Sequence, residues 1–239
     1  QKKVTSFDEM TNIKKEIIEK LKKDFIISDL KIITKQVGTD VCKYLFELDD
    51  KNEIEAVLMR HDYGNSLCVS SQVGCNMGCK FCESGRLKKV RNLSTYEMVL
   101  QLLQVEQDLK LRISHLVLMG IGEPFDNYNN VINFMKIINH PLGLEIGARH
   151  ITVSTCGLVE KIYEYSDFDI QANLAISLHA PNNEIRNQIM NINRAYPIEK
   201  LIEAISYYIE KTNRRVTIEY ILLRGLNDSK ENANELADL

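Results

Sequence analysis

The sequence predicts an α/β fold: a partial (β/α) barrel that follows a small α+β amino-terminal extension. From residue 67 onward, apolar strand-like runs alternate with helical segments five times. Such strand–helix repeats predict a parallel sheet that curls into a barrel with right-handed crossovers. The first 60 residues carry one helical segment and several alternating runs instead. We therefore expect an amino-terminal part, 1–60, and a barrel core, 61–239.

The amino-terminal part is predicted to hold one amphipathic helix and an antiparallel meander. Residues 7–24 form the helix, with Ser6 as a candidate cap. Its apolar residues at helical spacing are Ile13, Ile17, Ile18 and Leu21. Polar and apolar residues alternate over 28–60, which is typical of half-buried strands. The expected strands are Lys31–Thr34, Lys43–Leu48 and Glu53–Met59, with a turn at Asp49–Asn52. We expect this meander to pack beside the barrel.

The barrel core reads as five strand–helix units. The expected strands are Leu67–Val73, His115–Met119, His150–Ser154, Asn173–Leu178 and Val216–Leu222. The expected helices are Ser94–Leu109, Tyr128–Ile138, Leu158–Tyr165, Ile198–Lys211 and Ser229–Leu239. Ser94 and Glu97 have the spacing of a capping box. In such a sheet the ligand binds beyond the carboxyl ends of the strands.

Three cysteines follow the first of these strands. Cys75, Cys79 and Cys82 lie at i, i+4 and i+7 in the run Gln72–Cys82. An iron–sulfur cube normally takes four thiolates, so three leave one iron free to bind something else. The spacing would also line one face of a helix, but Gly74 and Gly78 favour a loop. A zinc knuckle would need a clear fourth ligand, which the sequence does not offer. A disulfide pair is the other alternative, disfavoured because no secretory leader is seen and the other cysteines are scattered.

Polar residues follow the other strands as well. Gly122 lets the backbone approach a ligand and Glu123 can accept from an ammonium group, although a Gly-Glu-Pro run is often only a turn. Ser154 and Ser177 can bond a carboxylate or a ribose, and Asn227 can bond donors and acceptors. His179 fits three interpretations: a ligand contact, a base or a structural histidine.

Composition narrows the class of protein. The 239 residues carry a net charge of −3 and no apolar run of membrane-spanning length, so we expect a soluble protein without a membrane partner. Six cysteines without a secretory leader indicate a reducing cytoplasm. That charge does not indicate nucleic-acid binding. A local basic patch is formed in sequence by Arg86, Lys88, Lys89 and Arg91, and lysines crowd the first 23 residues. Solvated surface is the favoured interpretation of both.

The cysteine run, with Phe81 just before the last cysteine, resembles the radical S-adenosylmethionine enzymes. More narrowly, the RlmN/Cfr family of rRNA adenosine methyltransferases is indicated by longer matches. They are Ser66–Cys82, Arg91–Leu93, Met119–Pro124, Ser177–Ala180, Asn227–Asp228 and Ser6–Asn12. This resemblance covers nearly the whole chain. It implies a 4Fe–4S cluster, S-adenosylmethionine, an electron donor such as flavodoxin or ferredoxin, and a monomer.

The resemblance also implies a reaction, the methylation of an adenine carbon in 23S rRNA and, for the RlmN branch, in tRNA. In the family, S-adenosylmethionine first methylates a cysteine near the carboxyl end. A second molecule yields a 5'-deoxyadenosyl radical that takes hydrogen from this methyl group, and the methylene radical adds to the base. Another cysteine then resolves the protein–RNA crosslink by forming a disulfide. Residues near Val73 and Met77 favour C2 methylation, and C8 is the alternative.

Roles carry over by match to the family's motifs. Cys75, Cys79 and Cys82 hold the cluster, Cys68 is the resolving cysteine and Glu55 the proton acceptor. The residues implied as S-adenosylmethionine contacts are Gly122, Glu123, Ser154, Ser177, Leu178, His179 and Asn227. Cys42 and Cys156 match no role, so we expect them to be structural.

The chain also departs from the family. We expect it to be a fragment clipped at both ends, without the methyl-carrying cysteine and the sixth strand, which would leave the barrel open. Residues 1–239 should then bind the cluster and S-adenosylmethionine without methylating RNA. Two alternatives stay open: a radical enzyme of another reaction class, and a non-catalytic RNA-binding module with a structural metal site.

Overall fold

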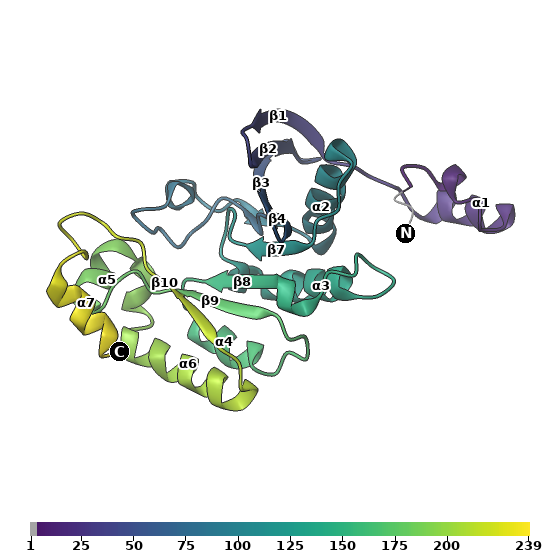
Figure 1. Cartoon of the computed structure of the whole chain (residues 1–239). Coiled ribbons are helices and arrows are strands. Elements are labelled where there is room, and N and C mark those ends of the chain that lie inside the picture. Colours follow the sequence, from purple (N-terminus) through teal and green to yellow (C-terminus); the bar gives the residue numbers. More distant parts are fainter. Residues whose placement is uncertain (1–3) are drawn as a thin grey trace.

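The computed structural model describes residues 4–239 and centres on one eight-stranded sheet of order β1-β2-β3-β4-β7-β8-β9-β10 (Figure 1). Its strands are β1 (Lys31–Val37), β2 (Val41–Glu47), β3 (Glu53–His61), β4 (Gly64–Cys68), β7 (His115–Leu118), β8 (Ile151–Thr155), β9 (Asn173–Ser177) and β10 (Val216–Glu219). Strands β4 to β10 pair in parallel, whereas β1 to β4 pair antiparallel. The predicted α/β class with a parallel sheet is confirmed.

Helices follow the parallel strands, as the repeat predicts. They are α1 (Lys15–Asp24), α2 (Thr95–Leu109), α3 (Tyr128–Asn139), α4 (Val159–Tyr165), α5 (Asn183–Ile189), α6 (Ile198–Thr212) and α7 (Lys230–Ala237). Short 3-10 helices are η1 (Phe7–Glu9), η2 (Glu83–Arg86), η3 (Pro124–Asn127), η4 (Ala148–His150) and η5 (Asn191–Arg194). The capping box at Ser94 and Glu97 is present at the start of α2. Within residues 4–239, no helix combines the length and apolar character that a membrane span requires.

The amino-terminal meander is part of the main sheet. Strand β3 pairs antiparallel with β4, the first parallel strand. Alternate residues of β2 and β3 are buried, and the Tyr44 hydroxyl donates to Asp108 of α2 at 2.6 Å. The meander and the barrel therefore share one hydrophobic core. The division into 1–60 and 61–239 stays a prediction.

Two predicted elements are wrong in extent. The helix expected over 7–24 is divided: Ser6 caps η1, and α1 begins only at Lys15. Thr11 and Asn12 lie in the break, and such side chains compete with helical hydrogen bonds. The strand expected over 67–73 is divided too, because the backbone N–H of Ser70 donates to Gln101 of α2 rather than to a neighbouring strand. Two short strands, β5 (Gln72–Val73) and β6 (Arg91–Asn92), then pair with each other.

Helix α5 was not predicted, and three strands end earlier than predicted. The α5 helix is only seven residues long, and Asn182 caps it by accepting from the N–H of Ile185 at 3.0 Å. A fully buried arginine in its middle, Arg186, hides the apolar period. Strand β10 ends at Glu219 because the N–H of Ile221 turns to the His179 ring at 3.1 Å. Strands β7 and β9 end one residue before Met119 and Leu178.

Candidate active site

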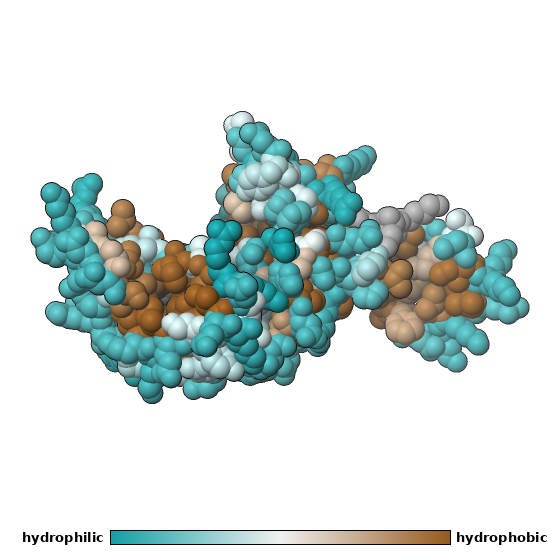
Figure 2. Space-filling view, turned by 60° about the horizontal axis from the view of Figure 1, so that its bottom comes forward, coloured by the Kyte–Doolittle hydropathy of each residue, from teal (hydrophilic) through white to brown (hydrophobic). Residues whose placement is uncertain are grey.

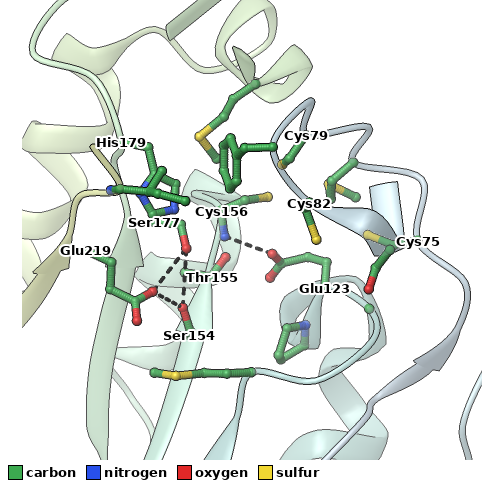
Figure 3. A pocket seen from close by; sticks show the side chains of 18 of the residues that line it. Cys75, Cys79, Cys82, Glu123, Ser154, Thr155, Cys156, Ser177, His179 and Glu219 are labelled. Carbon is green, nitrogen blue, oxygen red and sulfur yellow. Dashed lines mark hydrogen bonds between the residues drawn. The ribbon is translucent and has the colours of Figure 1, made fainter. Parts of the chain in front are cut away.

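A cavity of about 460 Å³ opens at the carboxyl ends of β7 to β10, against the cysteine loop (Figure 3). Figure 2 shows apolar side chains gathered in a hollow between the carboxyl-terminal helices and the centre of the molecule. The predicted site residues that line the cavity are Cys75, Cys79, Cys82, Gly122, Glu123, Ser154, Ser177 and His179. The predicted residues that do not line it are Glu55, Cys68, Leu178 and Asn227. Most of the expected ligand contacts therefore meet in one place.

The cysteine run is a closed loop rather than a helix. Gly74 has φ +72°, and a Cβ built there would lie 2.1 Å from the carbonyl oxygen of Lys88. The N–H of Cys75 donates to the carbonyl of Leu87 at 2.9 Å, which closes the loop. The N–H of Lys80 donates to the carbonyl of Ile189 at 2.9 Å, which fastens the loop to the end of α5. Glycine at position 74 is thus required by backbone conformation and by space.

The donor set fits a cluster better than a single ion. All three loop cysteines are free thiols at one side of the cavity (Figure 3). Across residues 4–239, no group of three His, Cys, Asp or Glu side chains is arranged to hold one metal ion. A tetrahedral zinc ion would draw its thiolates to about 2.3 Å from one centre. A cube of four irons and four sulfides is larger, so its ligand sulfurs stand farther apart. Three thiols without a nearby fourth are the donor set that a cluster with one open iron would use.

Burial raises the pKa of two thiols in the cysteine loop. It raises the pKa of Cys79 to about 12, and it also raises the pKa of Cys75. Metal binding requires thiolates, so iron would have to displace these protons. Uptake of a cluster should therefore release protons.

Glu123 is a buried carboxylate beside the cysteine loop. One of its oxygens accepts from the N–H of Phe125 at 3.0 Å and the other from the N–H of Cys156 at 2.8 Å. Burial raises its pKa. Gly122 precedes it with φ +110°, and a Cβ there would lie 2.6 Å from the Cβ of Gln72. These contacts hold a carboxylate with spare acceptor capacity toward the cavity.

The serines on the next two strands share a partner that the sequence did not single out. Ser154 donates to Glu219 Oε2 at 2.8 Å, and Ser177 donates to the same oxygen at 3.1 Å (Figure 3). Glu219 is the last residue of β10 and lines the cavity. The sequence predicts this strand to continue to Leu222, so the polar residues that it indicates lie after Leu222. Thr217 and Glu219 are alternate polar residues of this strand, and this alternation is the sequence feature that indicates Glu219.

His179 and Asn227 organise the loops around the cavity. The His179 ring stands nearly perpendicular to the Phe81 ring at 4.7 Å, and burial lowers its pKa to about 4. Its Nδ1 accepts from Ile221, so the ring at least supports the loop. The Asn227 amide donates to the carbonyls of His179 and Ile221 and accepts from the N–H of Leu223. Asn227 therefore closes the loop after β10. Leu178 is buried in the core.

Glu55 and Cys68 lie on neighbouring strands at the same end of the sheet. Cys68 ends β4 and pairs with Val57 of β3, and Glu55 lies two residues from Val57. Residues opposite each other or two apart on antiparallel strands share a face. Glu55 forms an ion pair with Lys43 at 2.6 Å, and burial raises the pKa of Cys68 to about 11. Register thus brings the two side chains to one face.

The two cysteines expected to be structural differ. Cys42 is buried in β2, within the main core. Cys156 is buried as well but lines the cavity next to Glu123. Burial raises the pKa of the Cys156 thiol well above its usual value.

Of the basic patch, three members pair with acids: Arg86 with Glu83, Lys89 with Asp126, and Arg91 with Asp50 and Glu97.

The parallel barrel strands and the three-cysteine loop at their carboxyl ends define a radical S-adenosylmethionine protein. A model of the Radical SAM superfamily matches residues 69–237. A solved structure described as "Crystal Structure of a radical SAM methyltransferase from Sphaerobacter thermophilus" superposes with a TM-score of 0.92 at 39% identity, over 98% of this chain and 70% of that chain.

Curated relatives narrow the class. A "Probable dual-specificity RNA methyltransferase RlmN" of Spiroplasma citri is 59% identical over 242 residues, covering all of this chain and 70% of the relative. The protein of the same name from Enterococcus faecalis is 59% identical over 244 residues, covering 68% of its length. The chain belongs to the RlmN family of the radical SAM superfamily. This membership implies an enzyme with a 4Fe–4S cluster and S-adenosylmethionine.

Proposed function

We propose that the reaction served by this chain is the methylation of an adenine carbon of RNA, C2 rather than C8, in 23S rRNA and in tRNA, and that residues 1–239 supply the part that binds the cluster and cleaves S-adenosylmethionine. The observation that carries the proposal is the convergence of one three-cysteine loop and the polar ends of β8, β9 and β10 on a single cavity. The names of the curated relatives support RNA as the substrate. An external donor such as flavodoxin or ferredoxin would supply the electron that reduces the cluster.

Cys75, Cys79 and Cys82 would hold the cluster and leave one iron open. The bound cluster supplies the one-electron chemistry that cleaves the sulfonium of S-adenosylmethionine. Glu123 lies beside this loop and lines the cavity, where its carboxyl oxygens can accept from the ammonium group of the ligand. The amino-acid end of S-adenosylmethionine therefore belongs on the cysteine side.

The serine pair at the other side suits the ribose rather than the carboxylate of the ligand. The hydroxyl groups of Ser154 and Ser177 both donate their hydrogen bonds to Glu219. The serine oxygens can therefore only accept from a ligand, and Glu219 adds a negative charge. A carboxylate has no proton to give and would be repelled, whereas ribose hydroxyls donate. These hydrogen bonds support the ribose as the partner of the two serines.

Cys68 and Glu55 are proposed as the resolving cysteine and the proton acceptor. Their shared face at the end of β4 supports this assignment. Glu55 would have to exchange its ion pair with Lys43 for contact with the base. Burial keeps the Cys68 thiol protonated near neutral pH, so it would need a base when it attacks.

The proposal is tested by anaerobic reconstitution with iron and sulfide, followed by dithionite and S-adenosylmethionine. We expect 5'-deoxyadenosine from the unmodified protein and none from a variant with Cys75, Cys79 and Cys82 changed to Ala. A triple variant in which Cys42, Cys68 and Cys156 are changed to Ala controls for the loss of three thiols and should still cleave. Cleavage without the loop cysteines would contradict the assignment. Filter binding of 23S rRNA fragments and tRNA, with DNA of equal length as control, tests the RNA preference.

A further inference from the structure

Arg186 is a buried cation at the back of the cavity. It lies in the middle of α5 and is the largest side chain that the structure buries fully. Its guanidinium donates to the carbonyl of Cys156 at 2.7 Å, of Leu178 at 3.1 Å and of Ser177 at 3.2 Å, and to Asn193 Oδ1 at 3.0 Å. The residue thus ties the carboxyl ends of β8 and β9 to the segment that follows α5.

No carboxylate balances this charge within residues 4–239: the acceptors of Arg186 are three main-chain carbonyls and one amide oxygen. An uncompensated buried charge costs several kcal/mol, about as much as a domain can spare. Burial accordingly lowers the pKa of Arg186. Cys156, whose carbonyl accepts from Arg186 at 2.7 Å, belongs to the small apolar cluster against which Cys79 packs, and Cys79 is a predicted cluster ligand. A compensating anion at the cysteine loop would therefore lie close to Arg186.

Helix α5 also touches the cysteine loop directly. Cys79 packs against the small cluster that contains Cys156, Ile185 and Ile189. The next residue, Lys80, donates its N–H to the carbonyl of Ile189. Arg186 therefore lies on the element that supports the loop of a predicted cluster ligand, and its side chain is fully buried. At low local dielectric a charge acts more strongly than it does at the surface.

We propose that Arg186 is a positioning residue for the cluster, whose buried positive charge is balanced by the thiolate-bound cluster and favours its one-electron reduced form. Reduction by an external donor adds one negative charge to the cluster, so a nearby cation stabilises the reduced form and raises the midpoint potential. The inference rests on the proposed cluster. It assigns Arg186 an electrostatic effect in addition to its hydrogen bonds.

The test separates charge from hydrogen bonding with three variants. Arg186→Gln removes the charge, Arg186→Lys keeps a charge but loses most of the hydrogen bonds, and Asn193→Ala keeps the guanidinium but removes one of its anchors. The reconstituted proteins are titrated with dithionite and redox mediators at pH 7, and the reduced cluster is quantified by electron paramagnetic resonance. Thermal unfolding of each variant is recorded in parallel.

We expect Arg186→Gln to lower the reduced fraction at a fixed potential about tenfold, which corresponds to about 59 mV for one electron. Arg186→Lys and Asn193→Ala should melt at lower temperature yet keep the midpoint near that of the unmodified protein. An unchanged midpoint in Arg186→Gln would overturn the inference. If Arg186→Gln holds no cluster, Arg186→Lys and Asn193→Ala test the inference, since both keep a positive charge at position 186. A lower midpoint potential in either of them would show that packing and not charge sets the potential, and would overturn the inference. No cluster in the unmodified protein would defeat the proposed function itself.

Discussion

Glu219 determines what the serines beside it can bind. Its Oε2 accepts hydrogen bonds from the hydroxyls of Ser154 and Ser177, so this side of the cavity offers a ligand acceptors and a negative charge. Residues of this kind select a ligand by the donors it carries. The expected ligand groups are the two ribose hydroxyls.

Glu219→Gln should therefore weaken the binding of S-adenosylmethionine about tenfold, near the 1.4 kcal/mol expected for a lost charge-assisted hydrogen bond. Anaerobic equilibrium dialysis measures this change, with Glu210→Gln on the exposed side of α6 as the matched control. The 2'- and 3'-deoxy forms of the ligand should bind both proteins with more similar affinity. An equal loss for all ligands would show that Glu219 does not contact the ribose.

His179 should make stability depend on pH. Its pKa is lowered to about 4 by burial, so the folded protein keeps the ring neutral while the unfolded chain takes up a proton near pH 6.5. Stability from this group is complete above pH 6.5 and is lost as the pH falls toward 4. The loss is at most about 3 kcal/mol.

Urea unfolding between pH 7 and pH 4.5 checks this expectation, with His179→Gln as the reference that cannot titrate. The difference in unfolding free energy between the two proteins should shrink as the pH falls. A difference that stays constant would mean that the ring titrates normally.

At the level of residues, the sequence identified the groups that follow each strand but not how they bond to one another. Ser154, Ser177 and His179 line the predicted cavity. Glu219 was not predicted because its strand was expected to continue to Leu222. Strand ends are set by tertiary hydrogen bonds, such as that from Ile221 to His179. Asn227 was expected at the ligand, but its amide is occupied by main-chain groups. Local pattern cannot show such partners.

The cysteine loop is the element on which the site depends. Two glycines at φ +72° and φ +63°, Gly74 and Gly78, let it fold back on itself. The sequence predicted this loop because glycine at such spacing disfavours a helix. The sequence did not predict α5, the helix that supports the loop, because a buried arginine interrupts its apolar face.

Gly74→Ala should abolish cluster uptake, because the new methyl group would meet the Lys88 carbonyl at 2.1 Å. Gly225→Ala is the matched control: Gly225 has a similar φ of +74°, but nothing lies within 4 Å of the built Cβ. That variant should show only the backbone strain, about 1 kcal/mol. Iron and sulfide bound per chain after reconstitution measure the outcome. Equal iron content in both variants would mean that the loop can relax.

At the scale of the whole molecule, one sheet connects the amino-terminal strands to the site. The antiparallel strands β1 to β3 extend the edge of the parallel sheet, and β3 brings Glu55 to the end of β4. The sequence predicted the meander and the barrel separately, since alternation reports which face is buried but not which strands pair. The antiparallel pairing of β3 with β4, from His61 opposite Gly64, joins the meander to the barrel.

The central claim is that Cys75, Cys79 and Cys82 hold a cluster whose fourth iron is open to S-adenosylmethionine. The most direct measurement is the electron paramagnetic resonance spectrum of the reduced, reconstituted protein before and after S-adenosylmethionine is added. The account predicts a cluster spectrum that shifts on addition of the ligand and is absent when the three cysteines are changed to Ala. A spectrum that stays unchanged while dialysis shows the ligand to be bound would contradict it.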